Sequence, residues 1–144
     1  MKLEDILQAW KTDSEIDKTA LDDEALKIPK LVGKYLEMLS NERLLLRKLE
    51  SDAKRLRLKK FVMYTQGLSK EDVEAGETLP AKGMILKTEA SMYVDADPDV
   101  QTLALRIDYA REKVETLDQI VKVVASRNFT LKTALDFLRF THGG

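Results

Sequence analysis

The residues best suited to chemistry in this 144-residue chain are basic side chains crowded between positions 43 and 60. That segment holds eight basic and two acidic residues, a net charge of +6, while the whole chain is nearly neutral at −1. A run of Lys and Arg on a helix can follow a phosphate backbone without reading its sequence, because charge neutralisation does not involve the bases. The segment therefore predicts a surface for a polyanion, with a solvated coiled-coil flank as the alternative.

Helical spacing places these basic residues in two stripes beside an apolar seam. Steps of four, seven and three connect the residues of the first stripe, and steps of seven and four connect those of the second. The stripes are Arg43, Arg47, Lys54 and Arg57, and Lys48, Arg55 and Lys59.

Two aromatic residues, Phe61 and Tyr64, end the basic stretch. They could stack on bases, as aromatics do in single-strand binders. Packing in a helical core is the alternative.

Other chemistry has little support in the sequence. There is no cysteine and only one histidine, and no phosphate-binding loop, dinucleotide loop, zinc spacing or nucleophile elbow occurs. Asp95-x-Asp97-x-Asp99 resembles the start of a calcium loop, but Val100 and Arg106 stand where such a loop needs glycine and glutamate. We therefore expect no catalytic residue, no metal site and no cofactor, and we expect these acids to cap a helix.

Acidic blocks flank the basic segment. Residues 1–26 carry three basic and eight acidic side chains, and residues 69–99 carry the same numbers, so each block has a net charge of −5. Such separation suits an electropositive site between acidic segments, or charge pairing between segments or subunits. The N-terminus lacks the cationic and apolar blocks of a secretory signal, and no apolar run approaches the length of a membrane span.

Two long helices must position the basic residues. Apolar residues recur at alternating steps of four and three over 28–63 and over 100–124, which is a heptad pattern. A helix this long cannot bury such a seam alone, and the equal periods predict an antiparallel helical hairpin. The seams are Ile28, Val32, Tyr35, Leu39, Glu42, Leu46, Leu49, Ala53, Leu56, Lys60 and Met63, and Val100, Leu103, Ile107, Ala110, Val114, Leu117, Val121 and Val124.

Four positions on the first long helix break or end the pattern. Glu42 and Lys60 are charged seam residues, which either fix the register or the oligomeric state of the helices or mark a place where the seam opens to solvent or a ligand. Pro29 is expected to kink or divide the helix near its start, and Gly67 to terminate it.

The predicted fold class is all-α, a single domain over residues 1–144. A short helix and connector occupy 1–18, the long basic helix 19–67, an acidic connector with short helices 68–97, the second long helix 98–127, and a C-terminal oligomerisation helix with a tail 128–144. Asp97, Pro98 and Asp99 open the second long helix with a cap, a favoured first residue and a favourable charge.

Short motifs carry a family resemblance over nearly the full length of the chain. They are Met1-x-Leu3-Glu4-Asp5 with Asp13 and Ile16-Asp17-x-Thr19-x-Leu21, Tyr64-Thr65-x-Gly67 after the basic helix, Lys87-Thr88, Ala96-Asp97-x-Asp99-Val100, and Ser126-Arg127-x-Phe129-x-Leu131-Lys132 with Asp136 and Arg139-Phe140. Each motif is short, but their order and spacing argue against chance. The chain resembles the UvsY family of phage recombination mediators.

The resemblance implies a non-catalytic recombination mediator that acts in the cytoplasm of an infected bacterial host. Such a protein binds single-stranded DNA as a homo-oligomeric ring, a hexamer or heptamer, and helps a RecA-like phage recombinase displace the phage single-strand-binding protein. The rival classes are a coiled-coil scaffold that does not bind DNA and a small enzyme, against which the missing catalytic residues argue.

Two sets of site residues follow from the pattern and the resemblance together. The DNA-binding set is Arg43, Arg47, Lys48, Lys54, Arg55, Arg57, Lys59, Lys60 and Tyr64. The oligomerisation set is Phe129, Leu131, Leu135 and Leu138.

Overall fold

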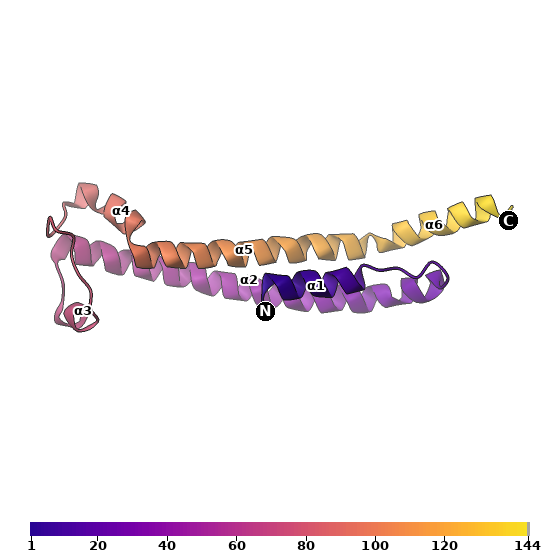
Figure 1. The fold of residues 1–144 in the computed structure, drawn as a ribbon, viewed down its shortest axis with the longest axis horizontal. Helices are drawn as coiled ribbons and strands as arrows, with labels where there is room; N and C mark the ends of the chain where they lie inside the picture. The colour runs from indigo at the N-terminus through magenta and orange to yellow at the C-terminus, as the bar shows by residue number, and fades with distance from the viewer. Residues whose placement is uncertain (144) are drawn as a thin grey trace. The chain divides into compact units, whose positions relative to one another are not determined.

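Helices joined by irregular segments make up the part that the computed structural model describes, residues 1–143, where no strand occurs (Figure 1). The prediction of an all-helical fold is therefore confirmed. The helices are α1 (Leu3–Asp13), α2 (Leu21–Gln66), α3 (Lys70–Glu74), α4 (Lys87–Ala96), α5 (Pro98–Ala125) and α6 (Arg127–Thr141).

The chain divides into two compact units. Unit 1 comprises Met1–Leu44 and Ala110–Gly144, and unit 2 comprises Leu45–Tyr109. Both α2 and α5 contribute residues to each unit, since the division falls within them. The periodicity of the seams gave no sign of this division, because the heptad pattern continues through it.

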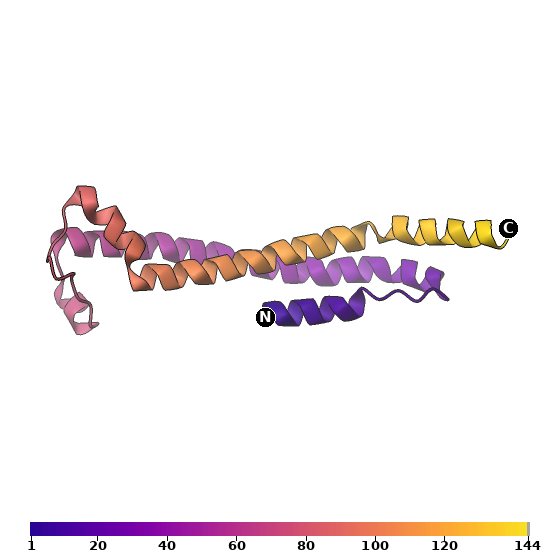
Figure 2. The ribbon, with the colours of Figure 1, turned by 45° about the horizontal axis from the view of Figure 1, so that its top comes forward.

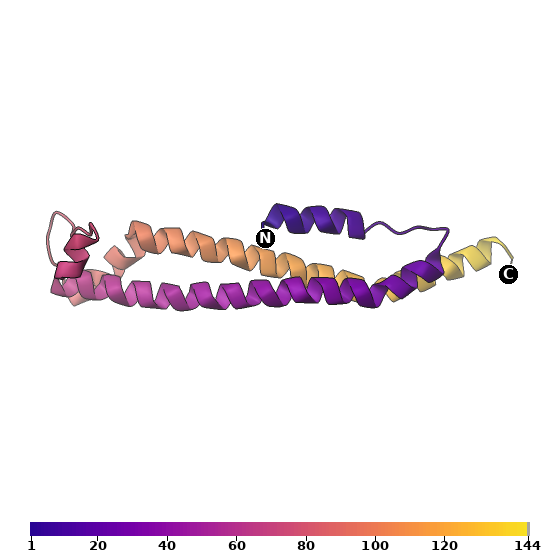
Figure 3. The same ribbon diagram turned by 90° about the horizontal axis from the view of Figure 1, so that it is seen from below.

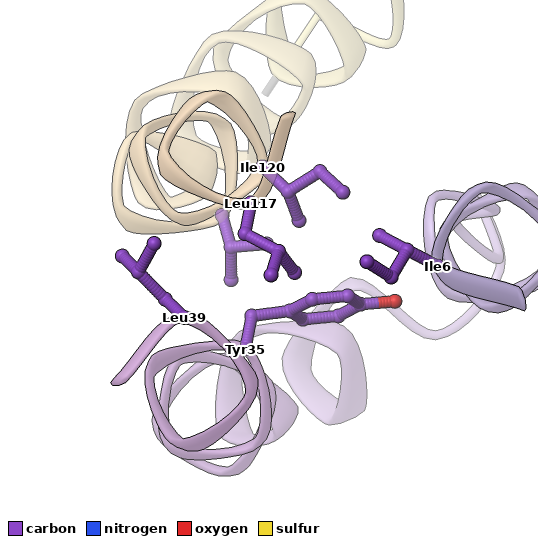
Figure 4. Close-up of a cluster of buried hydrophobic side chains, with 6 residues drawn as sticks. Ile6, Tyr35, Leu39, Leu117 and Ile120 are labelled. Atoms are coloured by element: carbon purple, nitrogen blue, oxygen red, sulfur yellow. The ribbon is translucent and has the colours of Figure 1, made fainter. Parts of the chain in front are cut away.

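Unit 1 is built on an aliphatic and aromatic core. Figure 4 shows Ile6 of α1, Tyr35 of α2, and Leu117 and Ile120 of α5 around a common centre, with Leu39 of α2 directed toward α5. These side chains are almost fully removed from water. Each large apolar side chain that is buried in this way stabilises the fold by about 1.5–3 kcal/mol, so this cluster is the main attraction between the three helices.

A polar cluster closes the core of unit 1 at the end of α1. The Tyr35 hydroxyl and the Lys34 ammonium donate to Asp13 Oδ2 at 2.8 and 2.6 Å. Arg127 donates to the backbone oxygen of Asp13 at 3.0 Å and lies 5.7 Å from the centre of the Trp10 ring. Trp10 also meets Tyr35 edge to face, with ring centres 5.7 Å apart. The end of α1 is thus fixed to α2 and to the start of α6.

Unit 2 packs the connector 67–97 around the end of α2. Its buried core contains Met63, Tyr64, Ile85, Val94 and Val100. The Ile85 amide donates to the Tyr64 carbonyl at 2.8 Å, which ties the irregular part of the connector to the helix. Figure 2 shows α3 and α4 on either side of the segment that joins them, at the C-terminal end of α2. The connector is therefore ordered by contacts within its own unit.

The seams remain away from solvent along both long helices: every seam position of α2 and α5 is buried or half-buried. At Pro29 the helix is not divided, because α2 continues unbroken from Leu21 to Gln66. Figure 3 shows the first turns of α2 bent relative to the turns that follow, the usual effect of a proline inside a helix. At the other end, Gly67 has a φ of +92° and its amide donates to Met63 O at 2.9 Å, so the glycine ends the helix as predicted.

Candidate nucleic-acid interface

Five of the predicted DNA-binding cations lie exposed on the part of α2 that belongs to unit 2. Within residues 1–143, none of the five takes part in an ion pair. Unpaired exposed cations contribute little to folding, but each can exchange a counterion for a phosphate, which is the main source of sequence-independent affinity. These five residues, which we call the free cations, are Arg47, Lys48, Lys54, Arg55 and Lys59.

Two further predicted residues are exposed but already have acidic partners. In unit 1, Arg43 lies 3.5 Å from Asp118, and in unit 2, Arg57 lies 2.6 Å from Asp95. Exposed ion pairs are worth about 0–1 kcal/mol, so a phosphate can compete with either carboxylate. Both arginines therefore remain available to a polyanion at a small cost.

Lys60 is placed differently from the other predicted cations. Only 1% of its surface is exposed. Its ammonium lies 2.8 Å from Asp99, 2.9 Å from Glu77 and 3.4 Å from Asp97. The charged seam position therefore fixes the packing of unit 2 and does not open to solvent. In this conformation the Lys60 ammonium is not accessible to a phosphate. This differs from the prediction that Lys60 is one of the DNA-binding residues.

Tyr64 is also buried, where the sequence left stacking on a base and core packing as alternatives. Its hydroxyl donates to Asp97 Oδ2 at 2.5 Å, and its ring lies 6.2 Å from that of Tyr93. Burial and the hydrogen bond to the Asp97 carboxylate raise the pKa of Tyr64 to about 12. Phe61 is half-buried against the same core. The aromatic residues of the basic stretch therefore belong to the packing of unit 2.

Asp97 connects the helix cap with the Lys60 cluster. Its Oδ1 accepts from the amides of Asp99 and Val100 at 2.9 and 3.2 Å, so the predicted cap is present. Burial alone would raise the pKa of Asp97. The hydrogen bonds from Tyr64 and Val100 and the charge of Lys60 outweigh it and hold that pKa below its usual value. Asp97 thus stays ionised and serves both the cap and the cluster.

Glu77 is the member of this cluster that the sequence did not single out. It lies 17 residues from Lys60 in an irregular segment, so no periodicity relates the two. The only signal available was the acidic composition of residues 69–99, which indicated charge pairing without naming a partner. Burial alone would lower the pKa of Lys60, but hydrogen bonds to Asp99 and Glu77 raise it above its usual value.

The predicted oligomerisation residues on α6 separate into two groups. Phe129, Leu135 and Leu138 are exposed. Leu131 is only 6% exposed and packs inside unit 1. Two hollows of about 550 and 490 Å³ lie in unit 1 beside α6, and Leu131 and Leu138 line both. The helix therefore presents apolar side chains to solvent, which is typical of a surface that another chain covers.

No cluster of three or more His, Cys, Asp or Glu side chains within residues 1–143 has the arrangement of a metal site. In that same part of the chain, no helix is both long enough and apolar enough to cross a bilayer.

The fold is shared with solved structures of a phage recombination mediator. Three crystal structures of the bacteriophage T4 recombination mediator protein UvsY match with TM-scores of 0.80, 0.80 and 0.78 and identities of 26, 22 and 23%. The matches cover 100, 98 and 95% of this chain and 99, 99 and 98% of those chains. No curated protein matches the chain by sequence. The chain therefore has the helical fold of a known recombination mediator.

Residues 9–144 match the family described as "Recombination, repair and ssDNA binding protein UvsY". The chain belongs to the UvsY family. The resemblance inferred from the short motifs is thereby confirmed, and a general role as a recombination mediator is supported.

Proposed function

We propose that this protein is a non-catalytic recombination mediator that binds single-stranded DNA through α2. The observation that carries the proposal is the group of free cations, five unpaired positive charges between residues 47 and 59 in a member of the UvsY family. Arg43 and Arg57 add contacts by exchanging their carboxylate partners for phosphates. Lys60 and Tyr64 support the interface without contacting DNA, because they hold the acidic connector against α2.

The proposed assembly is a homo-oligomeric ring, a hexamer or heptamer, of helical hairpins formed by α2 and α5. The exposed apolar residues of α6 supply the contact between subunits. A ring makes later DNA contacts intramolecular, so a modest site in each subunit becomes strong avidity. In the cytoplasm of an infected bacterium, such a ring competes with the phage single-strand-binding protein and helps a RecA-like phage recombinase to load.

The decisive experiment removes three free cations together. The variant with Lys54→Ala, Arg55→Ala and Lys59→Ala should bind single strands of every sequence more weakly. The slope of log K against log salt should flatten by about two, which is about 0.7 per lost phosphate contact. The matched control replaces three exposed lysines elsewhere, Lys11→Ala, Lys30→Ala and Lys87→Ala.

The control removes the same net charge, so a local interface predicts that its salt slope stays near that of the wild type. Equal flattening in both variants would show a diffuse charge effect and not a site. If the wild type does not bind poly-pyrimidine strands at moderate salt, the coiled-coil scaffold becomes the better account.

Assembly has a separate test. Phe129→Ser, Leu135→Ser and Leu138→Ser together should give smaller species in sedimentation, because an apolar contact between subunits is lost. Leu131 is left unchanged, since its substitution would damage the interior of unit 1. A ring that survives the triple substitution would place the subunit contact elsewhere.

A further inference from the structure

A groove lies in unit 2 between the outer side of α2 and the segment that follows it. Its volume is about 580 Å³, within the range of about 300–1,000 Å³ that is usual for small-ligand sites. Arg55, Leu58, Lys59 and Val62 line one wall, at helical steps of three, one and three. Gly67, Leu68, Ser69 and Asp72 line the other. The groove contains two of the free cations and is distinct from the buried Lys60 cluster.

The second wall is held in place by a turn and a cap. Gly67 adopts a φ of +92°, a backbone conformation that lets the chain reverse beside α2. The segment then begins α3, where the amide of Asp72 donates to the Ser69 hydroxyl at 3.1 Å and the amide of Ser69 donates to Asp72 Oδ2 at 2.9 Å. These reciprocal bonds fix the wall before any ligand arrives.

The groove combines an apolar surface with charge at one side. Leu58 and Val62 are exposed apolar side chains within unit 2, although one turn of the same helix carries Arg55 and Lys59. Asp72 lies on the opposite wall, and its hydrogen bonds with Ser69 lower its pKa and keep it ionised. A ligand that fits must bring an anion to the cations, an apolar body to Leu58 and Val62, and hydrogen-bond donors toward Asp72.

We propose that the groove holds one nucleotide of the bound strand, with its base against Leu58 and Val62 and its phosphate on Arg55 and Lys59. The inference rests on the proposed function and adds a base contact to it. Amino and imino groups on a base edge can donate to Asp72, while the carboxylate repels phosphate and so sets the orientation. Lys48 and Lys54, which are also free cations, supply charge for the neighbouring phosphates.

An apolar protein segment is a poorer occupant. It would use Leu58 and Val62 but would leave Arg55 and Lys59 without an anion, whereas a single strand satisfies both chemistries in every nucleotide. The base contact requires no particular sequence, since each base has an apolar face.

The test compares an oligothymidylate with an abasic strand of equal length and phosphate number. The wild type should bind the oligothymidylate more tightly. Leu58→Gln with Val62→Gln should reduce that preference about fivefold, because the apolar surface offered to the base becomes polar. The salt slope should stay unchanged, since no cation is removed.

Two variants serve as controls. Leu105→Gln changes a leucine that is equally exposed in unit 2, 69% against 65% for Leu58, but lies outside the groove. It should keep the preference for bases, and Val62→Ile should keep it as well because the groove stays apolar.

The outcomes separate this inference from the proposed function. An unchanged preference in the double variant, or an equal loss for both strands, overturns the nucleotide site while DNA binding stands. Failure of the wild type to bind either strand overturns both.

Discussion

Each unit of the molecule buries one lysine, and the two lysines are satisfied in different ways. In unit 1, Lys113 pairs with Glu42 at 2.8 Å, and both side chains are buried. In unit 2, Lys60 meets three carboxylates that come from residues 17, 37 and 39 positions away. Unit 1 therefore contains a Lys–Glu pair beside a large apolar core, and the lysine also donates to the backbone oxygen of Met1 at 3.1 Å. In unit 2, a single ammonium joins α2 to the connector and to the start of α5.

The comparison shows what a buried charge does in each place. A pair between two facing helices can be exchanged for apolar side chains of similar size at little cost in stability. A cation shared by three carboxylates cannot, because its loss leaves mutually repelling negative charges. The connector of unit 2 is thus held by a charged cluster in addition to its apolar core, and the helices of unit 1 mainly by apolar burial.

The largest effect is expected from Lys60→Met. It leaves Asp97 buried without its cation and should destabilise unit 2 by about 3–5 kcal/mol. Hydrogen exchange should show lost amide protection in residues 85–97, with protection in unit 1 retained. The neighbouring Lys59→Met is the control, because Lys59 is an exposed residue whose substitution should stay within about 0.5 kcal/mol. Equal effects at both positions would contradict a special role for the cluster.

A somewhat smaller effect is expected in unit 1. Lys113→Met should cost about 3 kcal/mol, because Glu42 is left buried and uncompensated. The double variant with Glu42→Leu and Lys113→Leu should return to within about 1 kcal/mol of the wild type in thermal or denaturant unfolding. In unit 2, adding Asp99→Asn to Lys60→Met should recover much less, since Glu77 and Asp97 remain charged. Similar recovery in the two units would show that the Lys113–Glu42 pair and the Lys60 cluster do not differ in how they stabilise the fold.

One glycine directly after α2 and one inside it sharpen the comparison further. Gly67→Ala should destabilise unit 2 by about 1–2 kcal/mol, because a φ of +92° strains any residue with a Cβ. Gly33→Ala in unit 1 is the matched control: it lies inside the helix with open space around the added Cβ. That substitution should stabilise the helix by about 0.5–1 kcal/mol. Circular dichroism melting distinguishes the opposite signs.

The smallest effect concerns pH and Tyr64. A raised phenol pKa means that the stability contributed by Tyr64 is complete below pH 10 and is lost as pH rises toward about 12. A lowered pKa at Asp97 has the opposite sense: its contribution is present above about pH 3.8 and is lost as pH falls through the lower folded-state value. Tyr64→Phe should cost about 1 kcal/mol at neutral pH.

That variant should remove one late step from the tyrosinate absorbance titration and shift acid unfolding to higher pH. Tyr109→Phe changes an exposed tyrosine of unit 2 and is the control. A titration in which both variants lose the same step would place Tyr64 in contact with solvent.

The parts of this structure that local pattern determines were predictable. The four-three spacing identified the buried and half-buried residues of α2 and α5, and Asp97-Pro98-Asp99 identified the start of α5. Both were predictable because caps and seams depend on residues within one or two helical turns. The exposed cations also followed from spacing alone. None of these features requires knowledge of residues far away in the chain.

The burial and the contacts of Lys60, Tyr64 and Leu131 were not predictable, because their partners are distant in sequence. A lysine on a seam has the same local pattern whether it meets solvent, a phosphate or three carboxylates. Glu77 illustrates the limit, since it lies in an irregular segment where no period indicates which way a side chain points. For α6, an apolar face indicated burial without showing that Leu131 packs within the subunit while its neighbours face outward.

The arrangement around Trp10 makes the two units separately observable. Trp10 is the only tryptophan in the chain and lies in unit 1, against Tyr35 and the guanidinium of Arg127. Tryptophan emission therefore reports the opening of unit 1 alone, whereas Tyr64 and Tyr93 lie together in unit 2 and report on it through the phenol signal. Three of the four tyrosines lie in unit 2, so a strand that binds to the free cations should change the tyrosine signal before the tryptophan signal. The two signals together distinguish DNA binding from changes near α6.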